Sequence, residues 1–479
     1  MRVSTGHLYE RLAEEFAAAI ERGALRPGER LPSVRGLSAK RGISPATVVQ
    51  AYAALEHRGL IEPRSRSGYY VRRRLHVSIA APEVREIARK PRRVSVASAI
   101  HDLFDAMADP SVVPIGAACL SPELLPIERL NRLLSAVSRE LGSLGGTYGS
   151  TEGWLPLRRQ LARRGLETGM ALSANDLVVT NGALQALELA LRAVTRPGDI
   201  VAVESPTYFG VLQLVETLGL RAVTIPCHGE SGLDLAALAA ALERHPLRAC
   251  VAVPSFNNPS GACLAEEERI ALLALLSRYD VPLIEDDLYG DLHHRGARPR
   301  PVKAFDPHGR VLYCTSISKT LAPGYRIGWI AGGRYHDRIV QLKRGADMHT
   351  AVPLQAALSE FLAGGGYERH LRVLRARLAD QVERLRTAVA LRFPTGTRVS
   401  NPSGGFVLWV ELPEHVDSLQ FQRAALSKRI SVAPGVLFGA GNEFRHYVRL
   451  SAGHPWCERT ERAVGTLAEL ARAPTALAG

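Results

Sequence analysis

The stretch LYCTSISKTLAPGYRIGWI, residues 312–330, decides the fold of most of this chain. It begins with a short apolar run that predicts a buried strand, and this strand ends at Ser316 and Ser318, directly before Lys319. Arg326 lies seven residues beyond the lysine. Two hydroxyl groups and a guanidinium are suited to bind a phosphate monoester. Lys319 would then lie beside that phosphate without an evident ion-pair partner, which suits a lysine that forms a Schiff base.

Outward from this stretch, from about residue 112, strand-like runs such as DLVVT, DIVAVE, ACVAVPS and PLIEDD alternate with amphipathic segments of helix length. This alternation predicts a doubly wound, largely parallel sheet flanked by helices. From about residue 346, a long Arg-rich helix and the strands GFVLWVEL and HYVRLSAG predict a smaller α+β domain. Ligands of such sheets bind beyond the carboxyl ends of the strands.

Candidate binding residues collect at those predicted strand ends. Gly182 precedes a helix whose first amides, those of Ala183 and Leu184, can bind an anion. The segment PLIEDDLYGDL places Asp286 at a strand end, with Tyr289 three residues later. A lysine, a phosphate cup and a carboxylate against a ring nitrogen are what pyridoxal phosphate requires. The pattern therefore predicts a pyridoxal phosphate site, in which Asp286 keeps the ring nitrogen protonated and Tyr289 donates to the ring oxygen.

Three further residues fit the same site. Asn258 in PSFNNPSGA can donate to the ring oxygen, and Tyr208 in ESPTYFG can stack on the ring. Arg449 in RHYVRLS can bind a carboxylate through its planar guanidinium. The catalytic residues of the predicted site are therefore Lys319, Asp286 and Tyr289.

The front of the chain carries most of its basic charge. Residues 1–98 contribute +10 of the formal net charge of +13. Charge concentrated in this way is typical of a module that binds a polyanion such as nucleic acid. The segment HLYERLAEEFAAAIER, residues 7–22, predicts a helix with Leu8, Leu12, Phe16 and Ile20 on one face.

Two more helices and a hairpin follow. Ser33 and Ser44 are favourable N-caps, and Gly42 and Gly59 end the two helices that these serines begin. The hairpin, LIEPRSRSGYYVRR, alternates apolar residues around a glycine-containing tip, so the whole pattern predicts a winged helix-turn-helix.

The segment LPSVRGLSAKRGISPATVVQAYAALEHRGLIEPRSRSGYYV resembles the GntR-type winged helix of bacterial transcription regulators. The resemblance implies that the turn before the second helix, the start of the recognition helix and the wing approach double-stranded DNA. The implied DNA-binding residues are Ser33, Arg35, Ser44, Ala46, Thr47, Arg64, Arg66 and Gly68.

Residues 112–470 resemble the fold-type I, class I/II aminotransferases, on the motifs YGSTEGWLPLRRQLA, SPTYFG, NNPSG, EDDLYGDL, SISKTLAPGYRIGW and YVRLS. The resemblance implies an internal aldimine at Lys319. It implies a homodimer in which Tyr148 reaches the cofactor phosphate of the neighbouring subunit, and it places Gly116 in a segment that closes over the substrate.

A GntR-type winged helix joined to an aminotransferase-like domain is the arrangement of the MocR-like regulators, which the chain resembles over nearly its whole length. The expected domains are a winged helix (1–74), a linker (75–111) and an aminotransferase-like domain (112–479), whose large part ends near residue 345. The linker's Arg89, Lys90, Arg92 and Arg93 add either phosphate contacts or solvated charge.

The composition limits the kinds of site and the cellular compartment that we expect. The six cysteines are scattered without CxxC spacing, which predicts neither disulfides nor a metal site. No apolar run approaches the roughly 20 residues of a membrane span, and the N-terminus lacks the apolar core of a signal peptide, so we expect a cytoplasmic protein.

Three functions are consistent with these patterns. The leading hypothesis is a transcriptional regulator that binds pyridoxal phosphate at Lys319 and uses the aminotransferase-like domain mainly to sense the cofactor or an amine or amino-acid effector. The alternative is an active aminotransferase with an attached DNA-binding domain. A catalytically silent scaffold is a third, weaker reading.

Overall fold

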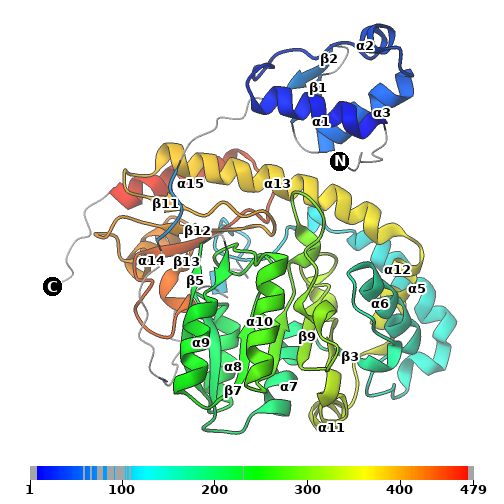
Figure 1. Cartoon of the computed structure of the whole chain (residues 1–479), viewed down its shortest axis with the longest axis vertical. Helices are drawn as coiled ribbons and strands as arrows, with labels where there is room; N and C mark the ends of the chain where they lie inside the picture. Colours follow the sequence, from blue (N-terminus) through cyan, green and yellow to red (C-terminus); the bar gives the residue numbers. More distant parts are fainter. Residues whose placement is uncertain are drawn as a thin grey trace. The chain divides into compact units, whose positions relative to one another are not determined.

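The computed structural model describes residues 8–57, 60–64, 67–72, 79–83, 91, 103, 105–106, 109–229 and 231–472. The chain divides into two compact units at Ser78 and Ile79 (Figure 1). Within the described ranges, no helix has both the length and the apolar character that crossing a membrane requires.

The smaller unit is the predicted winged helix. Its elements are α1 (Leu8–Glu21), α2 (Val34–Arg41), α3 (Pro45–His57), β1 (Ile61–Arg64) and β2 (Gly68–Val71). Helices α1 and α2 both pack against α3, whose Val48, Tyr52 and Leu55 are fully buried. Strands β1 and β2 pair antiparallel, with Ile61 opposite Val71, and form the wing.

Local capping explains where the helices of this unit begin. The Oγ of Ser33 accepts a hydrogen bond from the amide of Gly36, and the Oγ of Ser44 accepts one from the amide of Thr47, each at 3.1 Å. One predicted core position is wrong: Leu8 is 54% exposed. It is the first residue of α1 and lies beyond the edge of the core, which the neighbouring Tyr9 contacts instead.

The larger unit is built on an eight-stranded sheet, as the alternation of strands and helices predicts. In spatial order its strands are β3 (Leu177–Thr180), β10 (Gly328–Ala331), β9 (Val311–Ser316), β8 (Leu283–Asp286), β7 (Leu247–Ala252), β4 (Ile200–Ser205), β5 (Arg221–His228) and β6 (Gly232–Leu233). The pairs from β9 to β5 are parallel, whereas β10 and β6 run antiparallel to their neighbours. The carboxyl ends of β3, β9, β8, β7 and β4 therefore meet at one edge of the sheet.

Helices cover both faces of this sheet, which is why its central strands β4, β8 and β9 are buried throughout. In β4, Val201 and Val203 belong to the core shared with α7 (Ala183–Val194) and α8 (Phe209–Thr217). The alternate residues Ile200 and Ala202 pack instead with α9 (Leu235–Arg244) and α10 (Glu266–Arg278). This two-sided burial is typical of parallel sheets.

A second, four-stranded sheet, ordered β11 (Arg398–Val399), β12 (Val407–Glu411), β14 (Tyr447–Ser451) and β13 (Ala433–Pro434), forms the smaller part of this unit. The remaining helices are α5 (Ile127–Leu141), α6 (Leu155–Glu167), α11 (His336–Ala346), α12 (Val352–Ala363), α13 (Gly366–Arg392), α14 (Ser418–Ser427) and α15 (Glu458–Arg472). Figure 1 shows α13, in yellow, running from the side of α12 to the side of α15. This long helix therefore joins the part of the unit that is built around the large sheet to the part that contains the small sheet.

Part of the segment predicted as a linker packs against the larger unit. The carbonyl of Ala80 accepts a hydrogen bond from the amide of Val399 at 3.0 Å, and Glu83 forms an ion pair with Arg398 at 2.6 Å. Leu103 is 2% exposed, in a cluster with aromatic residues of the small part. The predicted phosphate-binding cations of the linker, Arg89, Lys90, Arg92 and Arg93, lie outside the described residues.

Candidate functional site

A pocket lies at the carboxyl edge of the large sheet, where the sequence predicts a ligand. Its free space is about 870 Å³ when the open solvent at its mouth is included. Eleven of the predicted residues line it: Ala183, Leu184, Tyr208, Asn258, Asp286, Tyr289, Ser316, Ser318, Lys319, Arg326 and Arg449. Residues more than 260 positions apart in the sequence therefore meet here.

One wall of the pocket is shaped to hold a phosphate. Helix α7 begins at Ala183, directly after Gly182 with φ +85°, and Ala183 and Leu184 of its first turn line the pocket. A β-carbon at Gly182 would collide with the guanidinium of Arg326, so the close approach of the two requires glycine. The Oγ of Ser318 is buried without a hydrogen-bond partner among the described residues. A phosphate oxygen would satisfy it, and the cup has the positive charge to hold the group.

Lys319 lies beside this cup. Its Nζ donates a hydrogen bond to the carbonyl of Ala118 at 2.7 Å. Burial lowers the pKa of Lys319 from its usual range, although the nearby Cys119 and Asp286 act in the opposite direction. A lysine with a lowered pKa is more often present as the neutral amine, which is the form that attacks a carbonyl carbon.

Asp286 lies at the end of β8, and its Oδ1 is buried without a partner among the described residues. Burial raises the pKa of Asp286 to about 7, and the charge of Asp287 acts in the same direction. A protonated ring nitrogen placed against Asp286 would supply the missing partner and favour the ionised carboxylate. The unpaired oxygen therefore fits the ring-nitrogen role that the sequence predicts.

The pH dependence of stability tests this burial in protein prepared without cofactor. Because the pKa of Asp286 is raised from 3.8 to about 7 on folding, its contribution to stability is fully present below about 4 and is lost as the pH rises through 7. Asp286→Asn stays neutral, so we expect its melting temperature to rise relative to wild type between those pH values. Asp306→Asn is the control: the pKa of Asp306 is lowered, so its loss should cost stability above about pH 4. Parallel pH profiles for Asp286→Asn and wild type would contradict the burial effect.

Tyr289, Tyr208 and Asn258 surround the space between Lys319 and Asp286. Tyr289 is buried against Phe406, and burial raises the pKa of its hydroxyl, so it remains a hydrogen-bond donor. All three line the pocket with Lys319 and Asp286, and their contacts to a ring and its oxygen stay predictions.

Arg449 enters the pocket from β14 and is 2% exposed. Its Nη1 donates to Oδ1 of Asn258 at 3.0 Å, and its Nη2 donates to the carbonyl of Gly116 at 2.6 Å. Its Nε has no partner among the described residues. Gly116 thus contacts Arg449, the residue predicted to bind a carboxylate, and does not itself line the pocket. A β-carbon at Gly116 would lie 2.7 Å from the backbone of Val432. Only glycine allows this close packing.

Tyr148 is not part of this pocket. It is 80% exposed and contacts the ring of His349 edge-on. Its expected contact with a neighbouring subunit stays a prediction.

Several pocket residues escaped sequence reasoning. Phe209 and Leu288 line the pocket next to the identified Tyr208 and Tyr289, and the sequence did not show that their side chains also face it. Cys119 lines it too, and no identified residue adjoins it in the sequence. Leu103 also lines it, although it comes from the segment predicted as a linker. No local pattern marks Leu103, because its position depends on packing against residues more than 100 positions away.

The predicted DNA-binding residues lie on the smaller unit. Ser33, Arg35, Ser44, Ala46 and Gly68 are exposed, and Thr47 is half-buried at the start of α3. The hydroxyls of Ser44 and Thr47 are hydrogen-bonded to each other at 2.8 Å. Arg64 belongs to β1, but its side chain and the whole of Arg66 lie outside the described residues.

Comparisons with known proteins agree with both units. Residues 127–466 match the family of class I and II aminotransferases, and residues 8–71 match the bacterial regulatory proteins of the gntR family. The chain is 39% identical to the HTH-type transcriptional regulator YdcR of Escherichia coli (strain K12), over 96% of this chain and 98% of that protein.

Two solved structures are similar to the larger unit. The kynurenine aminotransferase of Pyrococcus horikoshii, in complex with PMP and kynurenine, has 30% identity and a TM-score of 0.73, covering 78% of this chain and 94% of its own. LysN, an alpha-aminoadipate aminotransferase from Thermus thermophilus solved with N-(5'-phosphopyridoxyl)-L-leucine, has 28% identity and a TM-score of 0.72, covering 79% and 95%.

Proposed function

Because the chain belongs to the class I and II aminotransferase family and carries a gntR-family winged helix, we propose that it is a transcriptional regulator controlled by pyridoxal phosphate. The observation that carries this proposal is the gathering of the cofactor-binding set in one pocket of a chain whose other unit is a DNA-binding fold. The similarity to a regulator along nearly the whole chain supports the same arrangement.

Different residues of the pocket bind different parts of the cofactor. The amides at the start of α7, with Ser316, Ser318 and Arg326, hold the phosphate. Asp286 binds the ring nitrogen, while Tyr289 and Asn258 bind the ring oxygen and Tyr208 packs on the ring, as the lining of the pocket allows. Pyridoxal phosphate supplies an aldehyde that condenses with amines and a ring that accepts electrons.

Lys319 would be the amine that holds the cofactor when no effector is present, and an effector amine would take its place. Lys319 would then hold a proton or donate again to the carbonyl of Ala118, its partner at 2.7 Å. The two states differ in charge and contacts at the end of β9. A signal requires that DNA binding differ between them, because a ligand shifts an equilibrium only through differential affinity.

The working form in this proposal is a cytoplasmic homodimer that presents two winged helices to an operator. A dimer matches the twofold symmetry of paired half-sites. The exposed ring of Tyr148 provides an aromatic surface for a neighbouring subunit.

An active aminotransferase is the second candidate, and one observation favours it. Lys319, Asp286, Tyr289 and Arg449 all line the same pocket, so the groups for proton transfer and carboxylate binding are present together. Incubation with an amino donor and then a keto acid distinguishes the two. Many turnovers at a rate of about 1 s⁻¹ or more would indicate an enzyme, whereas a single slow conversion supports a sensor.

Arg449 predicts that the effector carries a carboxylate. Because its Nε is buried and unpaired, we expect wild-type protein to bind an amino acid more tightly than the amine that lacks the carboxylate. Arg449→Ala should lose this preference, by about 10- to 100-fold. Binding is measured by the change in visible absorption of the cofactor.

Arg269→Ala is the matched control. Arg269 is 1% exposed, but its guanidinium bonds Leu264, Pro254 and Ser255 and does not line the pocket. It should lower stability without changing the preference. An unchanged preference in Arg449→Ala would contradict the carboxylate role.

A further inference from the structure

A buried cluster of charged groups adjoins the pocket but takes no part in it. Asp287, directly after Asp286, accepts hydrogen bonds from Arg298 at 2.5 Å and from the hydroxyl of Tyr313 at 2.8 Å. The side chain of Asp287 is fully buried, and Arg298 is 15% exposed. The carbonyl of Asp287 also accepts a hydrogen bond from Thr315 of β9 at 2.8 Å. The side chain and the backbone carbonyl of Asp287 are thus both hydrogen-bonded to residues that do not line the pocket.

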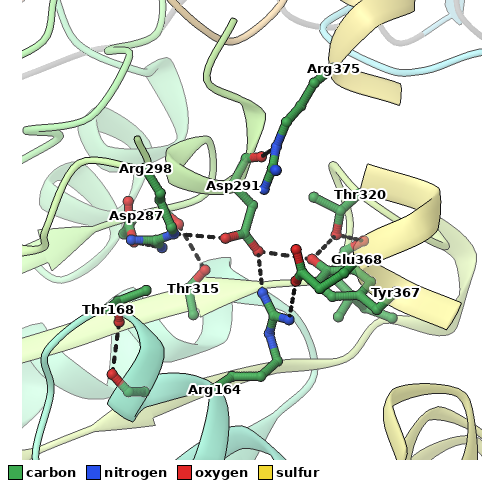
Figure 2. Close-up of polar contacts among 12 residues, drawn as sticks. Arg164, Thr168, Asp287, Asp291, Arg298, Thr315, Thr320, Tyr367, Glu368 and Arg375 are labelled. Atoms are coloured by element: carbon green, nitrogen blue, oxygen red, sulfur yellow. Dashed lines mark hydrogen bonds and ion pairs between the residues drawn. The ribbon is translucent and has the colours of Figure 1, made fainter. Parts of the chain in front are cut away.

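Asp291 is at the centre of this cluster (Figure 2). It lies in the short 3-10 turn Gly290–Leu292. Its Oδ1 binds Nε of Arg298 at 2.7 Å, and its Oδ2 accepts from Arg164 at 3.2 Å and from the hydroxyl of Tyr367 at 2.9 Å. Burial raises the pKa of Asp291, but the guanidinium groups of Arg298 and Arg164 outweigh it and hold the carboxyl well below its usual range. The carboxylate therefore stays ionised.

The cluster also contacts the segment that carries Lys319 and Thr320, which we call the lysine loop. The hydroxyl of Tyr367 is hydrogen-bonded to Oγ1 of Thr320 at 3.0 Å, and His370 donates from Nε2 to the carbonyl of Thr320 at 2.6 Å. Thr320 directly follows Lys319. Tyr367 and His370 belong to the first turns of α13, so the lysine loop is fastened to that helix.

Asp286 and Lys319 thus share one arrangement. Each directs its side chain into the pocket, and the residue after each, Asp287 or Thr320, is anchored in the cluster around Asp291. Buried ion pairs contribute little net stability, because removing charges from water offsets their attraction. A cluster that joins the carboxylates of Asp287 and Asp291 to the guanidinium groups of Arg298 and Arg164 is better explained by the positions that it fixes.

We propose that Asp291 is a positioning residue for the cofactor: it holds the backbones after Asp286 and Lys319 in one ionic frame, so that the ring-nitrogen partner and the reactive amine keep a fixed separation. The frame also ties both to the first turns of α13. This inference rests on the cofactor part of the proposed function, but it requires no DNA binding and no turnover.

The test is Asp291→Asn, with Asp306→Asn as the matched control. Asp306 is also a buried carboxylate paired with a cation, Lys303, at 3.1 Å, and its side chain is 1% exposed. It accepts a hydrogen bond from the amide of Val311 at 2.8 Å, at the end of β9 away from the pocket. Both variants lose one buried charge, so both should lower the melting temperature.

Only Asp291→Asn should affect the cofactor. We expect the affinity for pyridoxal phosphate to fall by about 10-fold or more, and the rate at which borohydride fixes bound cofactor on Lys319 to fall likewise in the folded, saturated protein. Asp306→Asn should change neither beyond about twofold. Equal effects of the two variants would overturn the inference. Failure of wild-type protein to take up the cofactor would instead overturn the proposed function.

A milder variant covers the case in which Asp291→Asn does not fold. Tyr367→Phe keeps the ring and every charge, and removes only the hydroxyl that joins Asp291 to Thr320. We expect an affinity loss of about fivefold, in keeping with one hydrogen bond. Folded Tyr367→Phe with wild-type affinity and fixation rate would contradict the positioning role.

Discussion

Lys319→Ala is expected to lose covalent attachment of pyridoxal phosphate completely, and to weaken retention of the cofactor by about 10-fold or more. Lys319 is the lysine that lines the pocket, and its amine has a lowered pKa. Any transamination by the wild-type protein should fall by about a thousandfold or more. Borohydride reduction followed by peptide mass mapping measures the attachment directly.

Lys303→Ala is the control for this prediction. Lys303 is also buried, but it bonds Asp306 and the carbonyl of Val311, at the opposite end of β9. It should lower stability and leave the fixed cofactor on Lys319. Cofactor fixed on a different lysine in both proteins would show that the pocket is not the site.

Arg35→Ala is expected to weaken specific DNA binding by about 10-fold and to reduce the slope of affinity against salt by about one ion if the contact is to a phosphate. Arg35 is the second residue of α2 and is exposed, next to the capped turn at Ser33. A fluorescence titration of operator DNA at several salt concentrations measures both effects.

Arg41→Ala is a close control, because Arg41 ends the same helix and is exposed as well. It is paired with Glu15 of α1 at 3.1 Å. Exposed pairs of this kind contribute little stability, so the variant should remain folded and bind DNA almost normally. Equal losses for Arg35→Ala and Arg41→Ala would indicate general charge attraction rather than a contact at Arg35.

Local patterns were sufficient for much of the fold and for the pocket's composition. The caps at Ser33 and Ser44 and the apolar run before Ser316 depend on neighbours within a few residues, and the structure confirms each. Lys319 and Asp286 were found because strand ends can be recognised locally and parallel strands bring their ends together.

Long-range pairing could not be predicted in the same way. The bond from Arg449 to Asn258 joins residues 191 positions apart, and the anchoring of Thr320 by Tyr367 spans 47 positions. The same holds for Leu103, whose burial depends on the small part of the unit. The strand end marks Asp286 in the motif EDDLYGDL, but no local pattern shows that Asp291 joins an ion cluster with Arg298 and Arg164.

The central claim is that the cofactor pocket controls DNA binding. Binding of the purified protein to the DNA just upstream of its own gene, titrated across a salt series with and without pyridoxal phosphate, tests it most directly. We predict specific, strongly salt-dependent binding whose affinity changes by about 10-fold with the cofactor. Specific binding that is identical in both states, or none in either, would contradict the claim and favour the aminotransferase.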